Sequence, residues 1–326
     1  MSSRMLGGRR LDELSRSEVQ ERLKHEGCCT LANIAWRGDP EQKVTIIKGV
    51  GVVVGAMRRH TLSRDVQDLG CRTLLGLSRI GGENQEKITG AGGVEVVVSA
   101  MQSFPKSKEI QELCCRTLLV LSSETENTKP RIVRAFGIDA VVAAMNALSA
   151  SEEIQEICCR VLANLGSEGA PVQITITQAG AIEAVVKAMH GHPESKLVQE
   201  QASRVVLVLA GSPENHEALV DAGRAIEAVV AGMLAHVPTR HVQVEGCRAL
   251  ECLARTGGEQ QRMRVAGAGG ITAVVAAMQA HGENKQLQEL GCWALVSFAR
   301  DSSENQVQIA ALGGIDAVVA AMRGNP

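Results

Sequence analysis

The sequence predicts an all-α protein built as a stacked array of about seven three-helix units. Three observations predict this fold class. A methionine recurs at an almost constant interval, a cysteine register recurs independently at the same interval, and apolar residues follow helical periodicity inside each interval. Self-similarity at a fixed period of about 20–50 residues is typical of arrays in which each unit packs against its neighbours.

The two registers agree on the number of units. The recurring methionine ends a motif of the type VVxAM and stands at Met57, Met101, Met145, Met189, Met233, Met278 and Met322, so that successive differences are 44, 44, 44, 44, 45 and 44. The second register is Cys28, Cys71, Cys115, Cys159, Ser203, Cys247 and Cys292, with differences of 43, 44, 44, 44, 44 and 45. Both series therefore predict seven copies of one unit.

Each unit is predicted to contain three helices. A short first helix follows an acidic turn that contains asparagine, as in SSENQVQIAA at residues 302–311, and a glycine pair opens the second, as in GGIDAVVAAM at residues 313–322. Asp316, near the start of that second helix, suits the helix dipole. The third helix is the longest, as in KEIQELCCRTLLVLSS at residues 108–123, where apolar residues at three-and-four spacing form one stripe.

One position of the third helix always holds a small residue. The residues at this position are Gly27, Gly70, Cys114, Cys158, Ala202, Gly246 and Gly291. We expect the missing side-chain volume to let a neighbouring helix approach closely.

The array begins and ends out of phase. Residues 1–16 are predicted to be an N-terminal extension and residues 17–326 a single repeat domain that starts with a third helix, at about residues 23–36, and stops after a second helix at Met322. A third helix should cover the last apolar face. We therefore expect Ile315, Val318, Val319 and Met322 to form a candidate assembly face that either meets another molecule or is covered by sequence absent from this chain. Head-to-tail self-association is one arrangement that covers it.

The short helix, the GGIxxVVxxM helix and the VQExGCWAL helix together resemble the armadillo repeat of importin-α and β-catenin, over roughly residues 18–323. The resemblance implies a right-handed superhelix whose third helices line a concave groove that binds protein segments. Importin-α carries a Trp there, followed four residues later by an Asn, and together they hold an extended basic peptide. At these two positions the last unit of this chain has Trp293 and Ser297. The first unit has Cys29 and Asn33, and the fourth has Arg160 and Asn164. The pair is intact in no unit, so the resemblance does not imply a basic ligand.

Five arginines fill the groove position of the intervening units: Arg72, Arg116, Arg160, Arg204 and Arg248. At about 100° per residue they lie about 135° from the centre of the apolar stripe, so we expect them outside the core. Two interpretations stay open. The arginines either recognise an acidic, phosphorylated or carboxylated ligand through their forks of donors, or only form ion pairs along their own helices, because Asp68, Glu112, Glu156 and Glu200 lie four residues before the first four.

Arg248 differs, because Val244 stands four residues before it. We therefore expect Arg248 to be the least neutralised arginine, and the strongest ligand contacts to fall at Arg248 and the neighbouring Trp293.

Composition narrows the function classes. A net charge of −2 and only Phe104, Phe136, Phe298, Trp36 and Trp293 as aromatic residues argue against nucleic acid, which needs a basic surface or stacking platforms. The sequence contains no run of about 18 apolar residues, so it predicts no membrane insertion. The N-terminus lacks the apolar core of a signal peptide. The cysteines fall in helical patterns without Cys-x-x-Cys spacing, which is typical of a reduced, cytoplasmic protein.

No constellation predicts catalysis, a cofactor or a metal. His60, His192, His236 and His281 each follow the repeat methionine by three residues, with His190 beside them, and we expect them to interact with helix C-termini. The GVGVVVG segment at residues 49–55 lacks the strand that a nucleotide-binding loop needs. The sequence thus favours a non-catalytic scaffold that binds an extended, acidic segment or helix of a protein partner along the groove. The alternative is a structural building block of a larger or self-associating assembly that uses its ends or outer surface.

Overall fold

The structure is a computed structural model that describes residues 49–123, 127–219 and 224–324, together with Gly27 and Thr30. Within these residues the regular elements are helices, and no strand occurs. The N-terminal extension of residues 1–16 lies outside the described residues. So does the third helix predicted at about residues 23–36, which contains Asn33, apart from Gly27 and Thr30. The chain divides into two compact units, Met1–Gly137 and Ile138–Pro326, each of which is considered by itself.

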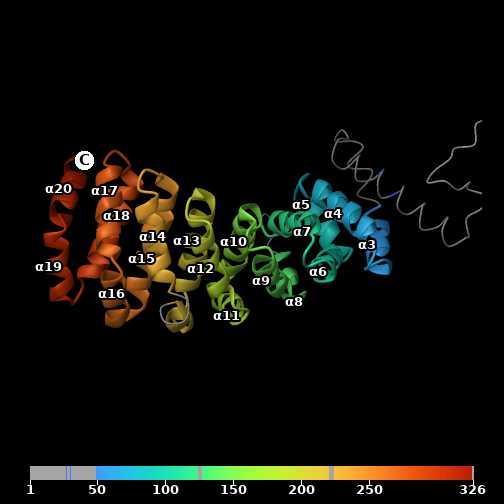
Figure 1. Cartoon of the computed structure of the whole chain (residues 1–326), viewed down its shortest axis with the longest axis horizontal. Coiled ribbons are helices and arrows are strands. Elements are labelled where there is room, and N and C mark those ends of the chain that lie inside the picture. Colours follow the sequence, from blue (N-terminus) through green and yellow to red (C-terminus); the bar gives the residue numbers. More distant parts are fainter. Residues whose placement is uncertain (1–26, 28–29, 31–48, 124–126, 220–223, 325–326) are drawn as a thin grey trace, which may run out of the picture. The chain divides into compact units, whose positions relative to one another are not determined.

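Unit 1 contains the helices α3 (Val50–Arg59), α4 (Arg64–Ser78), α5 (Gly82–Gly90), α6 (Gly93–Ser103), α7 (Lys108–Leu121) and α8 (Lys129–Arg134). The third helices α4 and α7 pack side by side, the second helices α3 and α6 contact each other, and α5 packs against α4 and α6 (Figure 1). This is the order of first, second and third helix that the sequence predicts.

Unit 2 begins with α9 (Gly137–Ala147), α10 (Glu152–Gly166), α11 (Ala170–Gln178), α12 (Ala181–Gly191), α13 (Lys196–Ala210) and the 3₁₀ turn η2 (Pro213–Asn215). It continues with α14 (Ala225–Ala235), α15 (Arg240–Thr256), α16 (Gly258–Gly267), α17 (Gly270–Ala280), α18 (Lys285–Ala299), α19 (Ser303–Ala311) and α20 (Gly314–Gly324). The third helices α10, α13, α15 and α18 pack in that order, as do the second helices α12, α14, α17 and α20 (Figure 1).

All seven repeat methionines fall in second helices, so the predicted repeat register is confirmed. Met57, Met101, Met145, Met189, Met233 and Met278 are almost fully buried. The small position on the third helix makes room for them: a Cβ added at Gly70, Gly246 or Gly291 would lie 2.5, 2.5 or 2.4 Å from the Cγ of the methionine of the same repeat. The element that approaches this position is therefore the second helix of the same repeat.

The turn before the second helix holds a glycine in several repeats. The residue before the helix has a left-handed backbone at Gly92, Gly180, Gly269 and Gly313, with φ between 78° and 91°. Such a φ favours glycine because a Cβ clashes with the following carbonyl. Two repeats depart from this rule, since Phe136 (φ 60°) and Arg224 (φ 50°) occupy the same turn.

The third helices begin at a polar N-cap. Ser107, Ser195 and Asn284 accept hydrogen bonds from the backbone N–H groups of Ile110, Val198 and Leu287, which satisfies amide donors that have no partner inside a helix. Ser63, Ser151 and Thr239 occupy the same place with extended backbone.

Among the described residues no single helix is long and apolar enough to cross a membrane. Two bent helix pairs, α16 with α17 and α19 with α20, reach that length and composition only when taken together.

Candidate interaction surface of the third helices

The five arginines lie on third helices and stay outside the core, as predicted. Arg72 is on α4, Arg116 on α7, Arg160 on α10, Arg204 on α13 and Arg248 on α15; Arg116 is half-buried and the others are exposed. In unit 2, α10, α13, α15 and α18 are successive neighbours. Three adjacent helices of that unit therefore each present a guanidinium at the same repeat position, and α18 presents the indole of Trp293 there. We call this set of positions, Arg160, Arg204, Arg248 and Trp293, the arginine register.

Three of the four predicted ion pairs within a helix form. Arg72 Nε lies 2.7 Å from Asp68 Oδ2, Arg116 Nη1 lies 2.5 Å from Glu112 Oε1, and Arg160 Nη1 lies 3.1 Å from Glu156 Oε1. Residues four apart share a helix face, so each carboxylate comes from the preceding turn.

The prediction for Arg248 is wrong. Arg248 Nη1 lies 3.4 Å from Glu245 Oε1. Residues three apart share a helix face just as residues four apart do, so Glu245 reaches Arg248 although Val244 does not carry a charge. Within the part of the chain that the structure describes, the pair expected between Arg204 and Glu200 does not form. Instead, Glu200 Oε1 accepts a hydrogen bond from Gln201 Nε2 at 2.9 Å. Arg204 is thus the least neutralised arginine of this register.

Burial makes the carboxyl group of Glu200 easier to protonate. The pKa of Glu200 is raised, first because burial disfavours its carboxylate, with the negative charge of Glu245 acting in the same direction. Arg204, His241 and the bond from Gln201 oppose the shift without cancelling it. When Glu200 takes up a proton at acidic pH, its negative charge no longer offsets the positive charge of Arg204.

The arginines cover their acids. In the Arg160–Glu156 pair the arginine side chain is 46% exposed and the glutamate 16%, and in the Arg248–Glu245 pair the values are 47% and 17%. The outermost polar groups of this surface are therefore guanidinium donors, although the pairs are nearly neutral in total charge. An incoming carboxylate or phosphate would meet these donors first.

Trp293 adds an apolar contact to the same surface. Its side chain is 57% exposed on α18, and Val296, one turn later, is also exposed. Asn164 is half-buried on α10, four residues after Arg160, and its backbone carbonyl accepts a hydrogen bond from Ser167 Oγ.

The candidate assembly face is apolar and largely exposed. Ile315, Val319 and Met322 on α20 are exposed and Val318 is half-buried, while Val307 and Leu312 extend the exposed apolar surface beyond α20.

Sequence reasoning missed a buried glutamine ladder. Each glutamine donates from Nε2 to two carbonyls at the end of the second helix, those of the repeat methionine and of the residue three later; for Gln199 these are Met189 O at 2.8 Å and His192 O at 3.1 Å. The members are Gln67, Gln111, Gln155, Gln199, Gln243 and Gln288. The same 44-residue spacing was visible in the sequence and could have identified them.

The histidines lie at helix C-termini, as predicted, and in unit 2 they also join neighbouring repeats. His192, His236 and His281 are the C-cap residues of α12, α14 and α17. Their Nε2 atoms lie 2.8, 2.7 and 2.8 Å from the carbonyls of Ser149, Pro193 and Val237 in the preceding repeat. Among the described residues no group of histidine, cysteine, aspartate or glutamate side chains has the geometry of a metal site.

The described cysteines are free thiols, mostly buried. Burial raises the pKa of Cys159 and of Cys247 to about 12. Cys71 Sγ and Cys114 Sγ, from the adjacent helices α4 and α7, are 3.4 Å apart.

The order of helices and the packing of the second and third helices define an armadillo-type helical repeat protein. The family description LRRK2 ARM repeat matches residues 41–210 and 137–265, which together exceed half of the chain. The chain belongs to this family. A comparison with curated protein sequences gave no match.

Solved structures agree on the fold. An engineered protein is 27% identical, with a TM-score of 0.78 over 96% of this chain and 75% of that chain. A designed armadillo repeat protein in complex with the peptide (KR)4 is 22% identical, with a TM-score of 0.65 over 76% of this chain and 99% of that chain. A chain from work on a phosphorylation switch between cadherin and beta-catenin is 14% identical, with a TM-score of 0.75 over 96% of this chain and 55% of that chain. The last two similarities concern the fold alone.

Proposed function

We propose that this protein is a non-catalytic interaction scaffold of the cytoplasm that binds an extended acidic segment of a partner protein along its third helices. The observation that carries the proposal is the layering of charge in unit 2, where exposed guanidinium groups of Arg160 and Arg248 lie over more buried carboxylates. Arg204, between them in the helix order, has no such acid partner among the described residues.

The sign of the ligand charge follows from these donors. The designed armadillo protein was solved with the basic peptide (KR)4. In this chain the Trp position of the resemblance is held by arginine on α10, α13 and α15, which would repel a basic segment. An extended strand advances about 3.3 Å per residue and packed helices lie about 8–10 Å apart, so an acidic group at roughly every third residue fits the repeat.

The test is a fluorescence titration of unit 2 within the whole chain. Two labelled peptides are compared, one with Glu at every third residue and one with Lys at the same places. The Glu peptide should bind, its affinity should fall with added salt because the contacts are largely electrostatic, and Arg204→Glu should weaken it by about tenfold, the loss expected for one charge-assisted hydrogen bond.

Arg323→Glu on α20 is the matched control, because it changes the net charge equally at an exposed site of another helix. Trp293→Ala should weaken only ligands with an apolar or cationic residue beside the acid. Tighter binding of the Lys peptide, or unchanged binding by Arg204→Glu and Arg248→Glu, would contradict ligand recognition by these arginines.

A second candidate is a building block that self-associates. The observation that favours it is the exposed apolar surface of Ile315, Val319 and Met322 on α20. Apolar patches of this kind on a protein surface mark contact sites with other proteins.

A further inference from the structure

A polar cavity in unit 1 lies apart from the arginine register. It has a volume of about 640 Å³ and is bordered by first helices α5 and α8 and by the start of α6. This volume falls within the range of about 300–1,000 Å³ that small-molecule sites occupy. It is therefore larger than a single ion needs.

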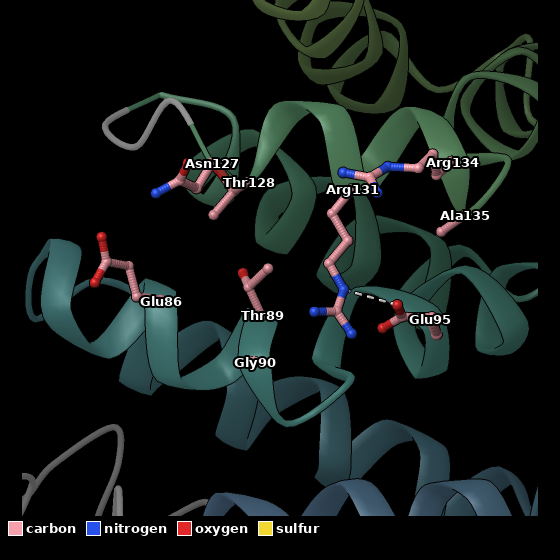
Figure 2. Close-up of a pocket in the computed structure, with 9 residues that line it drawn as sticks. All are labelled: Glu86, Thr89, Gly90, Glu95, Asn127, Thr128, Arg131, Arg134 and Ala135. Atoms are coloured by element: carbon pink, nitrogen blue, oxygen red, sulfur yellow. Dashed lines mark hydrogen bonds and ion pairs between the residues drawn. The ribbon is translucent and has the colours of Figure 1, made fainter.

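The helices place polar side chains on the facing walls of this cavity (Figure 2). Glu86 and Thr89 are three residues apart on α5, and Arg131 and Arg134 are three residues apart on α8, so each pair shares a helix face. Glu95 enters from α6, and its Oε1 accepts a hydrogen bond from Arg131 Nε at 2.8 Å.

Hydrogen-bonding groups remain unused at this wall. Thr89 is buried, and its Oγ1 has no hydrogen-bond partner among the described residues; the same holds for Glu95 Oε2. Figure 2 shows the Thr89 side chain directed into the space between α5 and α8. Arg131 donates a hydrogen bond from Nε to Glu95, and Arg134 donates one from Nε to the carbonyl of Pro130. The Nη groups of both arginines can therefore donate to other acceptors.

The charges of the lining are separated along the cavity. Two arginines and two glutamates balance in total, but Glu86 lies at one end along α5 while Arg131 and Arg134 lie toward the other (Figure 2). Glu95 neutralises only one of the two arginines. A ligand that matches this wall has no net charge and carries an anionic and a cationic group at opposite ends.

We propose that the cavity between α5 and α8 binds a short zwitterionic ligand of peptide type. Its carboxylate accepts hydrogen bonds from Arg131, Arg134 and Thr89, and its protonated amine lies at Glu86. Neutral Thr89 and the guanidinium Nη groups supply donors, so the carboxylate is recognised by shape as well as by charge. Two sources carry this chemistry: a free oligopeptide, or a partner segment with one basic and one acidic side chain.

The experiment uses ligand-observed NMR on the whole chain with triglycine as the probe. Matched probes are N-acetyl-triglycine, which lacks the ammonium group, triglycine amide, which lacks the carboxylate, and inorganic phosphate. Triglycine should bind, and each capped form should bind at least about fivefold more weakly, the factor that one net hydrogen bond supplies. Binding of the fully capped peptide acetyl-Lys-Gly-Gly-Glu-amide in place of triglycine would assign the cavity to a partner segment.

Variants connect the binding to this wall. Thr89→Val keeps the shape of the side chain and Arg134→Gln changes an exposed residue, so both should fold and both should weaken triglycine binding by about fivefold or more. Thr177→Val is the matched control, because Thr177 on α11 also has an unpartnered, buried hydroxyl and does not line this cavity. The proposal is overturned if no probe binds, if phosphate or a singly capped form binds as tightly as triglycine, or if Thr89→Val and Arg134→Gln bind like the parent chain.

Discussion

Gln199 shows how much a single buried polar residue contributes to one repeat. It is 2% exposed and donates to two carbonyls at the C-terminus of α12, Met189 O and His192 O. His192 O also accepts from the backbone N–H of Ser195, whereas the residue four after Met189 is Pro193, which has no N–H to donate.

We predict that Gln199→Ala destabilises unit 2 by about 1–3 kcal/mol, because it removes the side-chain donor of the buried Met189 carbonyl. Urea unfolding followed by circular dichroism measures the change. Gln286→Ala, at an exposed position of α18, is the control and should leave the unfolding midpoint unchanged. Equal midpoints for both variants would contradict the ladder as a stabilising element.

Glu200 gives a pH-dependent prediction. Its folded pKa is raised, mainly by burial, so the folded state binds the proton more tightly than the unfolded chain does. The resulting stability is fully present below the unfolded pKa of about 4.3 and is lost as pH rises through the raised folded pKa.

At neutral pH the charged Glu200 therefore costs stability, and Glu200→Gln should stabilise the protein there by less than about 1 kcal/mol, since the group is partly screened by solvent. Most of the advantage should be lost near pH 4, because the raised pKa keeps Glu200 mostly protonated in the folded state there. Denaturant unfolding at the two pH values measures it, with the exposed Glu194→Gln as control. A gain that is larger at pH 4 than at pH 7 would reverse the sign of the argument.

The residue scale also shows where sequence reasoning ended. Helix periodicity placed Arg72, Arg116 and Arg160 outside the core and beside their acids. It could not decide between acids three or four residues away, which is why Arg248 was misjudged. It also could not foresee that Gln201 would engage Glu200, because that depends on side-chain rotamers and burial.

Among the elements, the turn before the second helix is the place where the chain departs from its own repeat. Phe136 has φ 60° and is 67% exposed, in a turn where Gly92, Gly180, Gly269 and Gly313 have similar backbone angles. A side chain with a Cβ in this conformation costs about 1–2 kcal/mol, and an exposed ring regains little of that by burial.

We predict that Phe136→Gly stabilises unit 1 by about 0.5–1 kcal/mol, the strain relieved less the larger backbone entropy of glycine in the unfolded chain. Thermal unfolding measures the gain. Phe136→Ala is the matched control, because it removes the ring but keeps the Cβ and should bring no such gain. Equal stabilisation by alanine would show that the ring, not the backbone angle, is unfavourable.

Repetition made the elements predictable. The recurring methionine places each second helix, and the apolar stripe places each third helix. The cavity between α5 and α8 could not be placed in this way, because Arg131, Arg134 and Glu95 do not recur in all units. A site formed by residues that do not recur at the repeat interval can be identified only from the three-dimensional structure.

At the scale of the array, neighbouring repeats of unit 2 complete one another's polar contacts as well as the core. His236 bonds to Pro193 of the preceding repeat, and Ser195 Oγ donates to Glu152 Oε1 across the same kind of boundary. Stability in such arrays is approximately a sum over repeats and their interfaces, so surfaces without a following repeat contribute least. Ile315, Val319 and Met322 on α20 are exposed.

We predict that the chain self-associates with increasing concentration through α20 and that Val319→Glu shifts it towards monomer, because a charge buried in an apolar contact is costly. Sedimentation velocity over a concentration series measures the association. Leu197→Glu is the control, since Leu197 is also an exposed apolar residue but lies on α13, and it should leave the association unchanged. A chain that stays monomeric at every concentration, or equal effects of the two variants, would remove α20 as a self-association surface. Loss of association by Val319→Glu with unchanged binding of the Glu peptide would show that the two surfaces act independently.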